Sequence, residues 1–220
     1  MKKKNSVKKS EEKILSQVPP DYYQRGIKDN FFQRIWHKGK LEAVSDLIEG
    51  EPESILDVGC ASGWFLFELS KKYPNAKCTG IDKYKKAIEY GQKKYKKIKL
   101  IFGDAHEIPF KNSSFNLVIC TEVLEHVENP KAVLQEIKRV LTPNGSVIFE
   151  IDTGNLLFRL VWFWWTNIRR GVWRDAHLHV YNLDSLIKLI KKNGFKIKKQ
   201  KIFNFTMGVA FLLKKELGKI

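Results

Sequence analysis

A glycine-rich turn between Gly59 and Gly63 could bring the main chain into contact with a nucleotide. Glycine has no Cβ, so the backbone at these two positions can approach a ligand closely. The turn follows the apolar run Ile55–Val58 and precedes a helical pattern, so the first N–H groups of that helix would face the same ligand. Glycine spacing of this kind suits several nucleotide cofactors and also occurs in ordinary strand-to-helix turns.

Acidic residues near the ends of three successive expected strands narrow the choice of ligand. Asp57 lies inside the first strand, where a buried carboxylate needs a ligand amine or backbone N–H groups as partner. Asp82 ends the second strand, where it could accept hydrogen bonds from ribose hydroxyls. Asp104 follows the third strand, where it could accept from an adenine amino group. This acidic edge suits a cationic sulfonium nucleoside better than a pyrophosphate.

Five motifs in this order resemble the class I S-adenosylmethionine-dependent methyltransferases, especially their small-molecule and ubiquinone-biosynthesis-like branch. The motifs are Leu56–Gly63, Gly80–Asp82, Gly103–Ala105, Phe115–Val118 leading into Glu122–His126, and Leu141–Gly145. The resemblance spans residues 54–151 and implies a seven-stranded sheet with S-adenosylmethionine as cofactor. It also implies that the glycine turn surrounds the methionine part, that Asp82 binds the ribose, and that Asp104 and Ala105 lie against the adenine.

The cofactor-binding residues that we expect combine these motifs with their neighbours. They are Asp57, Gly59, Cys60, Ala61, Gly63, Asp82, Lys83, Asp104, Ala105 and Thr121. Ala61 departs from the family pattern, which often has a third glycine there. Alanine costs little unless the position requires a positive φ, so we expect cofactor binding to be unaffected.

The segment after the fourth strand is the candidate catalytic region. On a helical turn Glu122, Glu125 and His126 would share one face. The catalytic residues that we expect are Glu122 and His126, the latter as a general base. Alternatively, Glu122, Glu125 and His126 could hold a divalent metal, with His177 or His179 as a distant fourth ligand. Some similar enzymes with this motif depend on a metal, whereas in many others it shapes the cofactor pocket, and our prediction is that no metal is bound.

A tryptophan-rich connection, Leu156–Trp165 followed by Arg169, Arg170 and Trp173, is the most individual part of the chain. Tryptophans beside arginines are typical of segments that lie in a membrane interface, so residues 156–173 could contact an anionic membrane. The segment is too short to span a bilayer. The alternative is a helix that packs on the sheet or lines the acceptor pocket. Both interpretations favour a hydrophobic or lipid-linked acceptor.

Two other segments could contact the acceptor. The aromatic residues before the first strand include Tyr23 and Trp36, and in similar enzymes such a helix covers the cofactor and the acceptor. His177 and His179 lie in a segment that faces the active site in similar enzymes. We expect these four residues to contribute to the acceptor site, although the aromatic residues could equally serve packing.

Alternating apolar runs and amphipathic stretches predict an α/β fold with helices on both faces of the sheet. The expected parallel strands are residues 54–58, 78–82, 98–102, 115–121 and 146–151, and the expected C-terminal antiparallel hairpin is 195–203 with 209–213. Asn129 with Pro130, and Asn182, should begin the two helices before and after the tryptophan-rich connection. Pro143–Gly145 should end the first of these helices.

The domain organisation follows from these assignments. Residues 1–13, with six lysines, predict a disordered basic tail. Residues 14–53 predict a helical lid, and residues 54–220 a methyltransferase domain with an aromatic-rich insertion at 153–181. Neither a signal peptide nor a transmembrane segment is recognisable, which favours a cytoplasmic protein that could associate with a membrane.

The composition limits the choice of partner. Forty Lys and Arg residues outnumber twenty-four Asp and Glu residues, which gives a net charge of +16. Such a surface attracts anionic lipids and nucleic acids, although a lysine-rich proteome explains it equally well. Cys60, Cys78 and Cys120 have no CxxC spacing, which argues against a disulfide framework and a zinc site.

The sequence as a whole predicts methyl transfer by in-line displacement to a small, hydrophobic or lipid-linked acceptor. Such a transfer needs little covalent help, because positioning and exclusion of water supply most of the rate. The alternatives are a methyltransferase of RNA ribose, suggested by the charge, and a non-catalytic peripheral membrane protein. Nucleic acid is the less favoured partner; the chain lacks the Asn/Asp-Pro-Pro-Tyr/Phe motif of base-amino methyltransferases, which counts against that subclass but not against ribose methylation.

Overall fold

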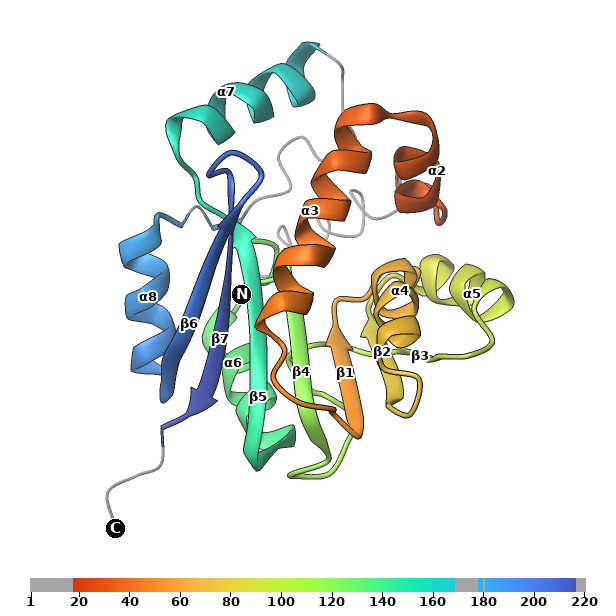
Figure 1. Cartoon of the computed structure of the whole chain (residues 1–220), viewed down its shortest axis with the longest axis vertical. Coiled ribbons are helices and arrows are strands. Elements are labelled where there is room, and N and C mark those ends of the chain that lie inside the picture. Colours follow the sequence, from red (N-terminus) through yellow and green to blue (C-terminus); the bar gives the residue numbers. More distant parts are fainter. Residues whose placement is uncertain (1–17, 169–177, 180, 217–220) are drawn as a thin grey trace, which may run out of the picture.

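The fold is a seven-stranded mixed sheet covered by helices on both faces (Figure 1). A computed structural model describes residues 18–168, 178–179 and 181–216. The strand order is β3-β2-β1-β4-β5-β7-β6. The strands are β1 (Ser54–Val58), β2 (Lys77–Asp82), β3 (Lys99–Phe102), β4 (Phe115–Thr121), β5 (Leu141–Asp152), β6 (Phe195–Phe203) and β7 (Gly208–Lys215). The first five are parallel and β7 is antiparallel to both β5 and β6, which confirms the predicted sheet.

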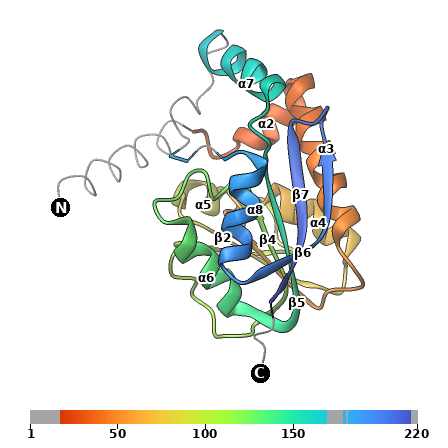
Figure 2. The same ribbon diagram turned by 90° about the vertical axis from the view of Figure 1, so that its left-hand side faces the viewer.

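The central strands are apolar runs because both faces of the sheet are covered. One core cluster joins the sheet to α6 (Pro130–Val140) and α8 (Leu183–Lys192). A second cluster joins the opposite face to α3 (Phe31–Leu47), α4 (Trp64–Lys72) and α5 (Lys85–Lys94). Figure 2 shows α6 and α8 on one side of the sheet and α3 and α4 on the other.

Two helices begin where the sequence predicts. The Asn129 side chain accepts a hydrogen bond from the Ala132 N–H, and Pro130 occupies the first turn of α6. Asn182 and Ser185 form a capping box at the start of α8. Both caps satisfy N–H groups that the first helical turn leaves without a partner.

The predicted break at Pro143–Gly145 lies inside β5. Leu141 is opposite Phe115, whereas Ser146 is opposite Leu117, so three extra residues bulge out of the β5 edge between the two pairs. These three extra residues interrupt the hydrogen-bond ladder between β4 and β5 without ending β5, because β4 continues alongside it. The expected strand 146–151 is therefore longer than predicted.

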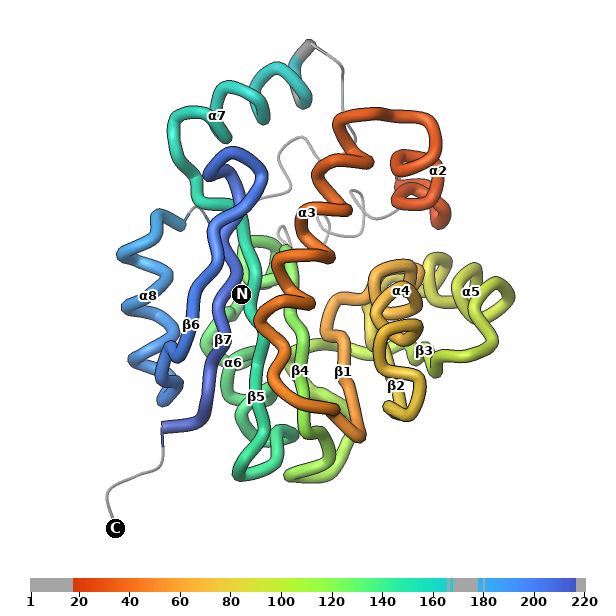
Figure 3. The backbone as a smooth tube through the Cα atoms, viewed as in Figure 1, coloured from red at the N-terminus to blue at the C-terminus, as the bar shows by residue number. Residues whose placement is uncertain are grey.

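Three helical segments lie beyond the carboxyl ends of the parallel strands: α2 (Tyr22–Asp29), the first half of α3, and α7 (Leu156–Phe163), which continues into a π-helix at Trp164–Ile168 (Figure 1). The turn between β6 and β7 rises between α7 and α3 (Figure 3). Its Asn204 side chain donates a hydrogen bond to the Trp36 carbonyl, 3.0 Å away. The turn thereby fixes α3 to the end of the sheet.

The insertion that contains α7 leaves and rejoins the domain at almost the same point. Gly154 has a φ of +59°, and a Cβ added there would lie 2.7 Å from the carbonyl oxygen of Tyr181. The glycine therefore lets the two ends of the insertion lie against each other.

Candidate cofactor and acceptor site

A large cavity lies between the carboxyl ends of the strands and the helices α2, α3 and α7. Its volume is about 950 Å³, which is at the upper end of the range for ligand sites. Its polar walls include Gly59, Ala61, Asp82, Lys83, Asp104 and Ala105. Its apolar walls include Phe31, Ile35, Leu157, Phe158, Val161 and Phe205. The cavity thus has one side suited to a polar nucleoside and one suited to an apolar molecule.

The glycine turn presents its backbone to the cavity. Gly59 has a φ of +79°, and a Cβ there would lie 2.3 Å from Cγ2 of Val123. The N–H groups of Gly59 and Cys60 both donate to the Ile81 carbonyl, at 2.9 and 3.0 Å. The turn is therefore tied to β2 and only glycine fits at its first position, as a close backbone cradle for a ligand requires.

Ala61 also adopts a left-handed conformation, with a φ of +48°. The position does adopt a positive φ, which is the condition under which alanine is no longer expected to cost little. A hydrogen bond from the Ala61 N–H to Oδ2 of Asp82, 2.7 Å long, holds the residue in this conformation. The sequence could not show this, because the constraint comes from a residue 21 positions away.

Asp82 connects the glycine turn to the start of α5. Its second oxygen, Oδ1, accepts from the Tyr84 N–H at 2.7 Å. These two hydrogen bonds orient the carboxylate of Asp82 in the cavity wall. Asp82 lines the cavity beside Ala61, at the place that the sequence predicts for a ribose.

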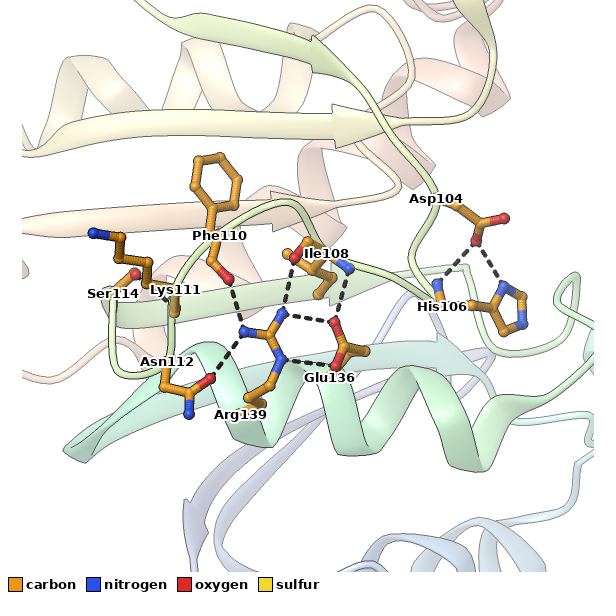
Figure 4. A network of polar contacts seen from close by, with 9 residues as sticks. All are labelled: Asp104, His106, Ile108, Phe110, Lys111, Asn112, Ser114, Glu136 and Arg139. Atoms are coloured by element: carbon orange, nitrogen blue, oxygen red, sulfur yellow. Dashed lines mark hydrogen bonds and ion pairs between the residues drawn. The ribbon is translucent and has the colours of Figure 1, made fainter.

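Asp104 is held by the residue two positions after it. Its Oδ1 accepts from the backbone N–H of His106 at 2.9 Å and lies 2.7 Å from that ring's Nδ1 (Figure 4). Burial raises the pKa of Asp104, but the hydrogen bonds from His106 outweigh it and the net pKa is lowered. Lys83 Nζ lies 3.7 Å from Oδ2. Asp104 is therefore an ionised, oriented acceptor in the cavity wall.

An arginine on α6 supports the loop that carries Asp104 (Figure 4). Arg139 donates to the carbonyls of Ile108 and Phe110, at 2.8 and 2.7 Å. Glu136 pairs with Arg139 at 2.7 Å and accepts from the Ile108 N–H. Sequence reasoning overlooked this support, although the spacing of Glu136 and Arg139 on one helix is typical of an ion pair.

Four of the expected cofactor residues do not line the cavity: Asp57, Cys60, Gly63 and Thr121. Cys60 points toward Gly80 of β2, since a Cβ on Gly80 would lie 2.7 Å from its Sγ. Asp57 is buried in β1, and burial raises its pKa to about 7, with Lys40 lowering it and Asp82 raising it. Cys60 and Gly63 belong to the turn itself, whereas Asp57 lies in β1 and Thr121 ends β4.

Glu122 is fixed by two side chains of α3. Its Oε2 lies 2.7 Å from Nζ of Lys40, and its Oε1 accepts from Nε1 of Trp36 at 2.9 Å. Burial raises the pKa of Glu122, but the attraction of Lys40 outweighs it and lowers the pKa to about 2. Sequence reasoning overlooked Lys40, although Trp36 and Lys40 share one helical face.

The expectation that Glu122, Glu125 and His126 share a helical face is wrong. Glu122 has a φ of +53°, and no helix includes it, so its side chain turns toward α3. Among the residues that the structure describes, no group of three or more His, Cys, Asp or Glu side chains is placed to hold a metal ion. The geometry therefore does not support the alternative of a site made by Glu122, Glu125, His126 and His179.

The remaining expected residues separate into two groups. Tyr23, Trp36 and His126 line the cavity. His179 does not line it. The ring Nε2 of His179 lies 3.0 Å from the Val127 carbonyl oxygen, and its backbone N–H donates to the Glu125 carbonyl. His177 lies outside the described residues.

His37, on the same helix as Trp36, is a further residue of the cavity wall. It is buried in the cavity wall with its ring 5.2 Å from that of Tyr23. Burial lowers its pKa to about 3, and the nearby Lys40 contributes. The imidazole is therefore neutral at physiological pH and can donate one hydrogen bond and accept another.

The chain is similar to known methyltransferases. Residues 56–149 match a family described as a methyltransferase domain. The demethylmenaquinone methyltransferase of Thermotoga maritima is 27% identical over 191 residues, which cover 79% of this chain and 82% of that protein. The malonyl-[acyl-carrier protein] O-methyltransferase of Hahella chejuensis is 31% identical over 118 residues, which cover 53% of this chain but only 42% of that protein.

A solved structure from Thermotoga maritima, described as a SAM-dependent methyltransferase and possible histamine N-methyltransferase, has the same fold. Its TM-score is 0.67 at 21% identity, over 83% of this chain and 90% of that chain. With the matched methyltransferase domain, the seven-stranded sheet and the glycine turn, the chain is similar to the class I S-adenosylmethionine-dependent methyltransferases, including their ubiquinone-biosynthesis-like branch.

Proposed function

We propose that this enzyme methylates an apolar, lipid-linked acceptor in the apolar half of the cavity. The observation that carries the proposal is the composition of that half. Aromatic and aliphatic side chains from α3, α7 and the β6–β7 turn form its walls, among them Phe31, Phe158 and Phe205. Burying such surfaces against an apolar ligand is favourable by about 25 cal/mol per Å².

The polar half of the cavity fits the cofactor. The backbone of Gly59 and Ala61 would hold the methionine part, Asp82 the ribose, and Asp104 with Ala105 the adenine. S-adenosylmethionine, when bound, supplies an electrophilic methyl group on a sulfonium. The chain's own contribution is to orient the acceptor toward that methyl group and to keep water out.

The lid formed by α2 and α3 would exclude water. Trp36 and Lys40 connect α3 to Glu122 on the floor of the cavity, and Gln24 of α2 donates to Ser62 Oγ, 2.8 Å away, beside the glycine turn. These contacts support a closed position of both helices over the cofactor half. The acceptor would then enter from the side of α7.

The names of the relatives support an acceptor that is larger than a polar metabolite. One is named for demethylmenaquinone and the other for a malonyl group carried by a protein. The aromatic walls of this cavity favour the first kind of acceptor over the second. An acceptor of that kind would be presented at a membrane.

The rim of the cavity supports contact with a membrane that contains anionic lipids. Exposed apolar side chains lie on the elements that form the cavity: Phe205, 78% exposed, with Phe31 and Phe32 in its lining, and Leu160, 60% exposed, with Leu156 and Phe163 on α7. Exposed apolar surface beside a binding cavity marks an interaction site. The net charge of +16 favours an anionic surface. No helix within the described ranges is long and apolar enough to cross a bilayer.

Transfer of a labelled methyl group tests the acceptor. Purified enzyme with labelled S-adenosylmethionine is incubated with lipid, RNA and polar-metabolite fractions, and an Asp82→Asn variant serves as the inactive control. We expect label in the lipid fraction. Label confined to polar metabolites would overturn the proposal, and label in RNA would favour the alternative of ribose methylation.

Vesicle flotation tests the membrane contact. We expect the protein to float with vesicles of phosphatidylcholine and phosphatidylglycerol, and Leu160→Ser to reduce the bound fraction. Phe102→Ser is the matched control, because Phe102 is 56% exposed on β3, at the opposite edge of the sheet from β7 and β6. Equal losses for the two variants, or no binding by the unaltered protein, would contradict a membrane contact through the rim.

A further inference from the structure

Two acidic side chains in the cavity wall have no role in the cofactor half. Glu125 follows β4 and is 2% exposed, and Asp152 ends β5 and is half-buried. Both line the cavity. Asp152 immediately precedes the insertion, whose Phe158 and Trp162 stack at 5.7 Å and line the same cavity. The two acids therefore provide polar groups close to an apolar wall.

The hydrogen bonds of Glu125 are incomplete. Within the described part of the chain, its buried Oε2 has no hydrogen-bond partner. Its Oε1 lies 3.9 Å from Nε2 of His126, which is too far for a direct hydrogen bond. Buried polar atoms are almost always satisfied, so an orphaned carboxyl oxygen in a cavity wall indicates a missing partner.

The surroundings of Glu125 contain an excess of acidic groups. Burial raises the pKa of Glu125 well above its usual range, and the nearby Asp152 and Glu122 raise it further. Burial also raises the pKa of Asp152 to about 7, with Glu122 contributing. The buried Lys40 is bound to Glu122. A ligand that donates a hydrogen bond would therefore relieve an unfavourable arrangement.

We propose that Glu125 and Asp152 form the subsite that binds the hydrogen-bond-donating group of the acceptor, a hydroxyl or a protonated amine. The inference rests on the proposed apolar acceptor and adds its polar end. A carboxyl oxygen accepts such a donor directly, and the surrounding apolar wall strengthens the bond by excluding water. This single polar anchor fixes which end of an apolar molecule points toward the cofactor half.

Binding of naphthalene probes to the full chain tests the subsite. The probes are 1-naphthol, 1-naphthylmethylamine and 1-methoxynaphthalene, which share a ring system but differ in their donor groups. We expect the unaltered protein to bind at least one of the two donors about tenfold more tightly than the methoxy compound. Whichever donor binds more tightly identifies the acceptor group as hydroxyl or ammonium.

Variants assign the preference to these residues. Glu125→Met should abolish the preference for the donors, Glu125→Gln should retain part of it through its amide oxygen, and Asp152→Asn should reduce it. Glu128→Met is the matched control, because Glu128 is exposed on the same segment. Thermal melts check that each variant is folded.

The outcomes separate this proposal from the function proposed above. Equal binding of all three probes by the unaltered protein would overturn the subsite alone, as would an undiminished preference in both Glu125→Gln and Asp152→Asn. Failure of every probe to bind would overturn the apolar acceptor and the subsite together.

Discussion

The conformation of single residues in the glycine turn sets the shape of the cofactor cradle. Gly59 and Ala61 both have positive φ, but a side chain is accommodated only at the second position. A left-handed alanine costs about 1–2 kcal/mol. Position 59 therefore excludes a side chain, whereas position 61 accepts one.

Gly59→Ala should lower the free energy of unfolding by about 1–3 kcal/mol, because it adds strain and displaces Val123. Ala61→Gly is the matched control and should change it by less than about 1 kcal/mol, since relief of strain offsets the greater entropy of the unfolded chain. Chemical denaturation measures both. A larger loss for Ala61→Gly than for Gly59→Ala would contradict this account of the turn.

The buried carboxyl of Asp57 should make stability depend on pH. Its pKa is about 7 in the folded protein and about 4 when unfolded. As the pH rises, the folded state therefore keeps the Asp57 proton longer than the unfolded state does. The stability that this protonated carboxyl contributes is fully present below about pH 4 and is lost as the pH rises through about 7.

The change in the free energy of unfolding caused by Asp57→Asn should therefore be more favourable at pH 8 than at pH 4, because the amide never ionises. Denaturation of both proteins across this range measures the difference, and a constant difference would contradict the raised pKa. Calorimetry with S-adenosylmethionine should show weaker binding by the same variant if Asp57 serves the cofactor.

At the scale of elements, one ion pair fastens the helix α3 to the segment after β4. Lys40 is 4% exposed and lies 2.7 Å from Glu122. Removal of one partner of such a pair leaves the other charge buried, whereas removal of both does not.

Lys40→Met should therefore destabilise the protein by about 3–5 kcal/mol, and adding Glu122→Gln should recover much of the loss. A double-mutant cycle from denaturation curves gives the coupling energy. Additive effects of the two substitutions would show that the pair does not fasten the lid.

The contacts of α6 with the loop after β3 lead to a different expectation. Arg139→Met removes hydrogen bonds to two loop carbonyls, yet its ion pair with Glu136 is partly exposed and contributes only about 1 kcal/mol or less. Hydrogen exchange in residues 104–112 should become faster, with little change in global stability. Lys131→Met, exposed on the same helix, is the control. Unchanged exchange would show that the loop is ordered without Arg139.

At the scale of the whole molecule, the sheet could be predicted because its information is local. Apolar runs, caps such as Asn129 and Asn182, and the spacing of the acidic residues each depend on neighbouring residues. The pairing of Lys40 with Glu122 depends on residues 82 positions apart. The missing partner of Glu125 depends on the complete set of its neighbours. Such features follow from the packing of elements, which periodicity does not encode.

The glycine at position 154 has a consequence for how this enzyme can change. Because Gly154 lies against Tyr181, the two ends of the insertion leave and rejoin the domain side by side. A segment whose two ends lie side by side can be replaced by another segment without displacing the strands or the glycine turn. Replacement of the insertion would therefore change the α7 wall of the proposed acceptor site, while the walls from α3 and the β6–β7 turn, and the glycine turn, would stay in place.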